Sequence, residues 1–225
     1  MKTLKLMLLL FFSVSLSTAT AQISKDAYKK RAEMMNLNKK MQEDKVSKES
    51  RKQAKQLTKE GWKVAPGALS LEKQLERAAL FQNSFEDDYV TPKYVSGDAT
   101  STAENYDAGK MQALEMARIN LVTSIEGSIT RIVENNTHNK QLGAGDAASV
   151  IGTLGKVKSH ITQKIGQTIP VIEVYKELKN GNVAVRVMTF YSMDNARKIA
   201  KEAIRKQMEE EGNKVLGDDL DKYVD

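Results

Sequence analysis

Apolar residues recur at spacings of three and four through the middle of the chain, which is the period of one helix face. From about residue 104 to 135 this period predicts one long helix, which the polar stretch 135–139 is expected to break. The period resumes after Asp146, which is expected to cap the next helix. The apolar positions that define the two faces are Met111, Leu114, Ala117, Leu121, Ile125, Ile129 and Ile132, then Val150, Leu154, Val157, Ile161 and Ile165.

Serine residues mark the starts of two more predicted helices. Ser70 and Ser192 each precede an apolar-periodic segment, and a serine hydroxyl at that position can accept a hydrogen bond from the free amides of the first turn. The first of these helices is predicted over 71 to about 84, and the second is predicted to end at Gly212. Residues 24–60 contain neither Pro nor Gly and are rich in helix formers, so a further helix is expected there.

The dipeptide Asn180-Gly181 predicts a β-hairpin closed by a two-residue type I′ turn. In that register Lys179 pairs with Asn182. One face then collects the pairs Leu178 with Val183, Lys176 with Val185, Val174 with Val187, and Ile172 with Thr189. We expect the face with the three valines to pack on helices, because a slip of one residue would turn them toward water.

Two further segments have weaker strand patterns. Trp62-Lys63-Val64 precedes the turn at Pro66-Gly67, and the segment 89–96 around Pro92 has the character of an irregular or edge strand. The pattern as a whole predicts an α+β fold: a small antiparallel sheet that includes a C-terminal β-hairpin, packed against several helices, with an N-terminal helical arm.

The first 21 residues have the pattern of a secretory signal peptide. Lys2 and Lys5 precede an apolar run over 6–16, and small residues lead to Ala21, after which cleavage is expected. The run is shorter than the roughly 20 apolar residues that span a bilayer, which disfavours the alternative of an uncleaved anchor. We therefore expect a periplasmic or other extracytoplasmic protein without a transmembrane segment after cleavage.

Composition excludes several kinds of chemistry. The chain has no cysteine, so disulfides, thiolate nucleophiles, cysteine-ligated zinc and iron–sulfur clusters are ruled out. Residue 22 is Gln, which cannot carry the lipid anchor of a bacterial lipoprotein. The formal charge of +6 is small for a chain of 225 residues, and two of the positive charges lie in the leader. The net charge therefore does not indicate a nucleic-acid partner.

The basic charge is concentrated in residues 22–64, which hold 13 Lys and Arg against 6 Asp and Glu. Such an arm can lie on an anionic lipid or envelope polymer, dock on a partner protein, or remain a solvated helix. The apolar positions are interleaved with cations over about two turns. The candidate partner-contact residues are Tyr28, Arg31, Met34, Leu37, Lys40 and Met41.

A set of structural motifs resembles exported bacterial envelope proteins of the LPP-twenty lipoprotein-like family. They are, in order, Gly61-Trp62-Lys63-Val64, residues 69–75, Tyr94-Val95-Ser96-Gly97, the Ala-rich helix from Tyr106, and the hairpin over 169–191. The likeness covers roughly residues 60–205. It implies an α+β domain in the periplasm or at the outer membrane, with an accessory role. The absence of a lipidation cysteine departs from the lipoprotein members.

Four patterns that resemble chemical motifs are better explained by structure. Residues 143–148 fit a dinucleotide fingerprint but lack the preceding strand, and Ser70-x-x-Lys73 lacks the companion motifs of a serine acyl enzyme. The histidines are isolated, and the acidic clusters do not follow calcium-loop spacing. No catalytic, cofactor or metal residue is therefore assigned; the residues concerned are Ser70, Lys73, His138, His160, Glu86, Asp87, Asp88, Asp218, Asp219 and Asp221.

The expected organisation is a signal peptide over 1–21, a basic helical arm over 22–60, an α+β domain over 61–212 and an acidic mobile tail over 213–225. Two function classes stay open. The favoured one is a non-enzymatic binding or accessory module of the cell envelope, and the alternative is a periplasmic hydrolase whose carboxylates meet only in the fold.

Overall fold

The computed structural model describes residues 45–87, 89, 91–140, 142–166, 168, 170–213 and 219–225. The chain divides into two units, residues 1–43 and 44–225, and the described residues all belong to the second. The predicted leader and the six candidate contact residues of the arm lie outside them. Within the described residues, no helix combines the length and the apolar character that crossing a membrane requires.

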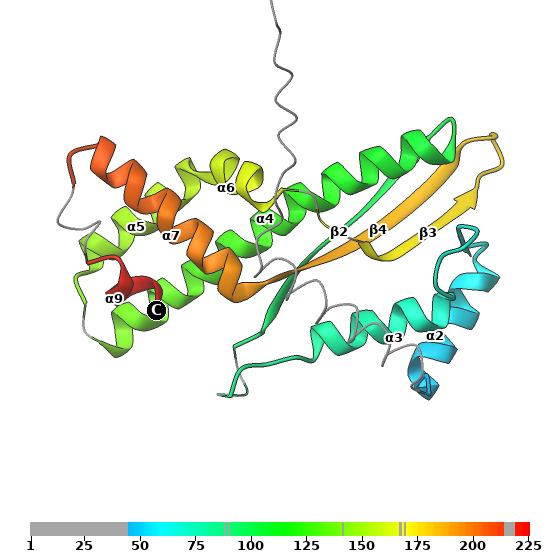
Figure 1. Cartoon of the computed structure of the whole chain (residues 1–225), viewed down its shortest axis with the longest axis horizontal. Coiled ribbons are helices and arrows are strands. Elements are labelled where there is room, and N and C mark those ends of the chain that lie inside the picture. Colours follow the sequence, from blue (N-terminus) through cyan, green and yellow to red (C-terminus); the bar gives the residue numbers. More distant parts are fainter. Residues whose placement is uncertain are drawn as a thin grey trace, which may run out of the picture. The chain divides into compact units, whose positions relative to one another are not determined.

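The fold is α+β, as predicted. Four antiparallel strands form one sheet in the order β1-β3-β4-β2, and helices pack around it (Figure 1). The strands are β1 (Lys63–Val64), β2 (Tyr94–Ala103), β3 (Pro170–Glu177) and β4 (Val183–Ser192). β1 is the short strand that the sequence predicted.

The second strand lies later in the chain than predicted. A strand over 89–96 was expected to end before Gly97, but β2 runs through this glycine to Ala103. Small residues such as Gly97 and Ala99 face the long helix α4 (Tyr106–Asn139), and they give little hydropathy signal. They are required there because a Cβ added to Gly97 would lie 2.0 Å from the Ala117 carbonyl oxygen of that helix.

The predicted register of the β3–β4 hairpin is wrong by one residue. Glu177 pairs with Val183 and Tyr175 with Val185. Gly181 N–H donates to the Leu178 carbonyl oxygen at 3.0 Å, and Leu178 N–H donates to that of Asn182 at 2.8 Å. The loop therefore has three residues, and within it only Gly181 has positive φ, at 85°, as in a turn that ends in a glycine bulge.

Helices cover both faces of the sheet. Val183, Val185 and Val187 pack against α4, which confirms the predicted helix contact of the three valines. The opposite face packs against α2 (Lys48–Lys59) and α3 (Leu71–Gln82). That second cluster contains Ala54, Trp62, Leu71, Leu75, Ala78, Phe81, Val171, Ile172, Val174 and Ala184. Because both faces are buried, hydrophobic alternation could not select between the two registers.

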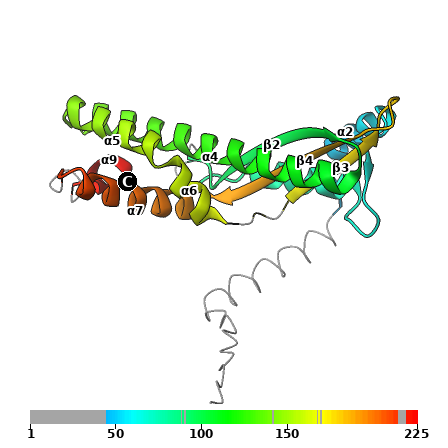
Figure 2. The same ribbon diagram turned by 90° about the horizontal axis from the view of Figure 1, so that it is seen from above.

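The helix α4 spans the sheet and a second, helical core (Figure 2). It begins at the N-cap Asn105, whose side chain accepts from Ala108 N–H at 2.9 Å. It does not break at 135: it continues to Asn139, with the Thr137 hydroxyl donating to the Val133 carbonyl. The predicted apolar face is correct except at Met111, which is 74% exposed.

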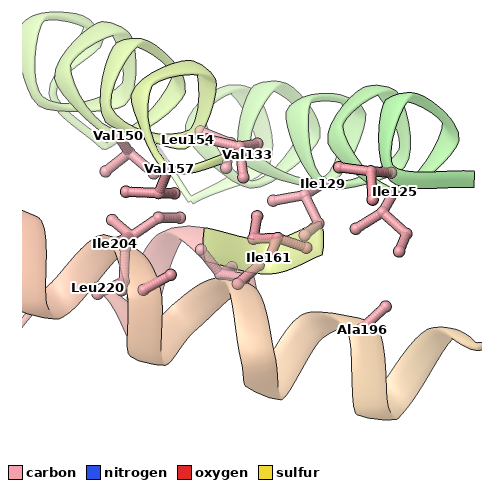
Figure 3. Close-up of a cluster of buried hydrophobic side chains, with 14 of the residues drawn as sticks. Ile125, Ile129, Val133, Val150, Leu154, Val157, Ile161, Ala196, Ile204 and Leu220 are labelled. Carbon is pink, nitrogen blue, oxygen red and sulfur yellow. The ribbon is translucent and has the colours of Figure 1, made fainter. Parts of the chain in front are cut away.

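The helical core lies between α4 and four further helices (Figure 3). These are α5 (Ala144–Lys156), α6 (Lys158–Ile165), α7 (Met193–Glu210) and α9 (Asp221–Val224). The five predicted apolar residues of 150–165 are buried in it. Four of them come from two helices rather than one, and Val157 lies at the junction between these helices. Gly143, not Asp146, stands at the N-cap of α5.

Both ends of the folded unit differ from the predicted boundaries. The tail over 213–225 was expected to be mobile, yet Leu220, Tyr223 and Val224 are buried in the helical core. At the other end, α2 packs on α3 through the buried Ala54, so residues 45–60 belong to the α+β unit rather than to the arm.

The two predicted serine caps have different outcomes. The Ser192 hydroxyl accepts from Asn195 N–H at 3.4 Å and starts α7. Ser70 occupies the N-cap of α3 but its side chain makes no capping bond. The buried Gln74 instead joins this region to the sheet, because its amide donates to the Leu69 carbonyl at 2.9 Å and accepts from Glu173 N–H at 2.8 Å.

Candidate functional site

The best candidate for a ligand site is a polar cavity of about 380 Å³, called here the Arg197 cavity. Its volume falls in the range of small-molecule sites, which is about 300–1,000 Å³. It lies where the 84–93 loop, α4, α7 and the C-terminus meet. The lining residues are Glu86, Thr91, Ile132, Asn135, Asn136, Arg197 and Asp225.

Backbone hydrogen bonds between described residues of the 84–93 loop hold Glu86 and Thr91 at the cavity. Glu86 N–H donates to the Thr91 carbonyl at 2.8 Å, and Lys93 N–H donates to the Ser84 carbonyl at 2.8 Å. Met193 N–H at the start of α7 donates to the Lys93 carbonyl, also at 2.8 Å. The loop is therefore anchored to the same helix that supplies Arg197.

Side-chain contacts fix the opposite wall. Asn136 on α4 donates to the Tyr223 carbonyl at 2.9 Å, and Lys201 Nζ lies 2.6 Å from Asp225 and 3.0 Å from Asp221. Burial alone would lower the pKa of Lys201, but its bonds to these two carboxylates outweigh burial and raise the pKa. Lys201 therefore stays charged at neutral pH and holds Asp225 beside the cavity.

Arg197 lines the cavity and also contains a buried hydrogen-bond donor. Its Nε is buried and has no hydrogen-bond partner among the described residues. A buried donor without an acceptor costs roughly 1–3 kcal/mol, and because this atom has no accessible surface a ligand acceptor could reach it only after the Arg197 side chain moved. Arg77 and Arg118 also have buried, unpaired Nε atoms, but neither lines this cavity.

Three large apolar side chains are exposed in the 84–93 loop and in the helix before it. Tyr89 at the tip of the loop is 88% exposed and has φ of 56°, a backbone conformation that is uncommon for a residue other than glycine. Phe85 in the loop and Leu80 near the end of α3 are also exposed.

The side chains that line the Arg197 cavity are better suited to binding a polar ligand than to acting as nucleophiles. Guanidinium, amide, hydroxyl and carboxylate groups together offer both donors and acceptors. Each of the two carboxylates has an ammonium neighbour, since Glu86 lies 3.9 Å from Lys93 and Asp225 lies 2.6 Å from Lys201. No group of three or more metal-ligating side chains occurs among the described residues.

A second cluster of polar groups has a structural role. The Tyr106 hydroxyl donates to Glu173 on β3, and Lys110 Nζ lies 2.7 Å from the same carboxylate. Burial, followed by the bond to Glu173, raises the pKa of Tyr106 above its ordinary value. These contacts attach the start of α4 to the sheet.

The structure brings together few of the residues that sequence patterns singled out. Residues 143–148 form a helix start after a helix and a loop, as expected, rather than a strand-to-helix turn. His138 is exposed at the end of α4. His160 borders a smaller cavity of about 150 Å³ together with Lys156, Val157, Ser159, Ala203, Lys206, Gln207 and Glu210.

Sequence reasoning missed most of the Arg197 cavity. Glu86 stands out in the sequence only as part of an acidic cluster, and Asn135 and Asn136 only as expected helix breakers. Arg197, Thr91 and Asp225 give no local signal, because the cavity is assembled from four separate segments of the chain.

Comparison of the chain with protein-family models, with curated proteins and with solved structures finds no match.

Proposed function

We propose that this protein is an exported cell-envelope module that binds its partner or ligand without turning it over, and that the Arg197 cavity is a binding site. Export is supported by the leader pattern over 1–21. The resemblance to the LPP-twenty lipoprotein-like family supports the same setting.

The observation that carries this proposal is a polar cavity that Arg197 lines together with two carboxylates that already have cationic neighbours. A guanidinium is permanently charged and offers donors in a fixed plane. The ligand expected from this chemistry is polar and rich in acceptor atoms, such as a sugar unit or a carboxylate of an envelope polymer.

A hydrolase is the second candidate, and one observation favours it. Glu86 and Asp225 are 139 positions apart in the chain, yet both line the Arg197 cavity. Two carboxylates in one cavity are the usual pair for acid–base chemistry on a glycoside. Reproducible turnover of an envelope polymer that Glu86→Gln abolishes would favour this reading over a binding module.

Replacement of Arg197 by methionine is expected to remove binding while keeping the side-chain volume. The measurement is proximity labelling in intact cells, which reports neighbours without presuming a chemistry. The matched control is Lys198→Met, which removes one positive charge from the adjacent position of α7, outside the cavity lining.

We expect Arg197→Met to lose neighbours that the wild type and Lys198→Met both label. Equal labelling by all three proteins would contradict the role of the cavity. The arm is tested in the same cells by deleting residues 22–43, which leaves α2 and its packing on α3 in place. Association through a basic arm should also weaken with salt, because exposed charges are screened over about 10 Å at 0.1 M.

A further inference from the structure

The strand β2 is a long sheet edge without a strand on its outer side among the described residues. It pairs with β4 over its whole length, from Tyr94 with Ser192 to Ala103 with Val183, without a shift in register. The strand order places it at the end of the sheet (Figure 1). Its outer side therefore presents a regular row of backbone donors and acceptors.

This edge lacks most of the features that usually prevent strand pairing; one of its acceptors, the Asp98 carbonyl, is bonded by the Asn120 side chain. Protected edges contain lysine, proline, a bulge or an inward-pointing charge. β2 has neither lysine nor proline and no bulge. Its single charged residue, Asp98, is already bound by Arg186, with nitrogen–oxygen distances of 3.1 and 2.5 Å.

An uncharged face of α4 lies beside the same edge. The Asn120 amide donates to the Asp98 carbonyl at 2.8 Å, so the face of α4 around Asn120 reaches the outer side of β2. We call this face the α4 strip; it consists of the exposed residues Gln112, Met116, Ile119, Asn120, Thr123 and Gly127. Met116 and Ile119 are 46% and 52% exposed, although they are large and apolar.

We propose that two copies of this chain associate through β2 and the α4 strip. The free edge of a strand can pair antiparallel with the same edge of a second copy about a two-fold axis. Residue i of one copy then pairs with residue j of the other, and residue j of the first copy pairs with residue i of the second. Such an axis, perpendicular to the sheet, places both α4 helices on the same face. The two strips then meet across the axis and bury Met116 and Ile119.

Charge does not oppose a second copy as the occupant of this face. The chain carries a formal charge of +6, or +4 without the leader, so two copies repel each other wherever their charged surfaces approach. The α4 strip contains no charged residue in a chain in which 28% of residues are charged. Charged residues of α4 flank the strip: Arg131 Nε donates to the Gly127 carbonyl at 3.2 Å, and Glu115 and Arg118 lie 3.8 Å from each other.

The test compares two methionine replacements on the same helix. The mature chain, residues 22–225, is examined by light scattering coupled to size-exclusion chromatography at about 100 µM, where a dissociation constant near 10 µM gives mostly dimer. Met116→Lys is expected to weaken self-association about tenfold or more, because an ammonium group would be buried in the contact. Met111→Lys, which is exposed on α4 but off the strip, should leave it unchanged.

A cross-link tests the strand without relying on a disruptive change. The chain has no cysteine, so Thr100→Cys gives one thiol on β2 and a short bismaleimide should join two copies. Met111→Cys should stay uncrosslinked under the same conditions. A monomeric wild type, equal weakening by both lysine variants, or equal cross-linking of both cysteine variants would overturn the proposal. A wild type that gains mass only with a different envelope protein would overturn it as well.

Discussion

Gly97→Ala is expected to lower the free energy of unfolding by about 3 kcal/mol or more, which is the upper range for overpacking a core. The new Cβ would lie 2.0 Å from the Ala117 carbonyl oxygen and 2.5 Å from Leu121 N. Both atoms belong to the backbone of α4, so relief requires the helix to move away from β2. Urea denaturation followed by circular dichroism measures the loss.

Two glycines of α4 provide a graded control for that replacement. A Cβ at Gly109 would meet Val185 Cγ2 at 2.8 Å, and a side chain can adjust more readily than backbone, so Gly109→Ala should cost less than Gly97→Ala. A Cβ at Gly127 would have no neighbouring atom within 4 Å, so Gly127→Ala should stabilise the protein by roughly 0.5–1 kcal/mol. Equal stability of all three variants would contradict the close contact of β2 with α4.

Leu220→Ala is expected to destabilise the protein by about 2–5 kcal/mol, as for a buried leucine in a core. Leu220 is fully buried with Tyr223 and Val224 against α4 and α7 (Figure 3). The polar contacts around it, including Asn136 with the Tyr223 carbonyl at 2.9 Å, hold the segment in place. The thermal unfolding midpoint should therefore fall.

The control for this tail variant is Lys222→Ala, two positions away on the exposed side of α9. Replacement of a surface residue usually changes stability by less than about 0.5 kcal/mol. If Leu220→Ala had no more effect than Lys222→Ala, the tail would behave as the acidic mobile segment that its composition suggested.

Helix faces were the part of the fold that periodicity could predict. Val150, Leu154 and Ile161 are buried as expected, and Leu121 and Ile129 are fully buried in α4. A three-to-four spacing reports burial directly because one side of each helix faces water. The prediction erred at Met111, near the start of α4, where small residues such as Gly109 and Ala113 make up the buried face against the sheet.

The strands were harder to predict for two physical reasons. The hairpin register failed because the argument assumed a sheet with one wet face, whereas Val174 and Val185 are buried against helices on opposite faces. β2 was misplaced because Gly97, Ala99 and Ser101 are small, and small residues are selected there by the close approach of α4 rather than by hydrophobicity.

No local sequence pattern could predict the candidate site. Glu86, Asn136, Arg197 and Asp225 share no spacing, and they meet only because α9 folds back on α4 and the 84–93 loop is anchored to α7. Leu220 in the tail carried an apolar signal, but its acidic neighbours outweighed it in the prediction. A buried donor such as Arg197 Nε becomes visible only when the surrounding atoms are placed.

Mass spectrometry of the N-terminal peptide, on protein recovered from separated cell fractions, tests the central proposal of an exported binding module most directly. The expected result is a chain that begins at Gln22 and is found in the envelope or periplasmic fraction. An intact Met1 on protein recovered from the cytosol would contradict it.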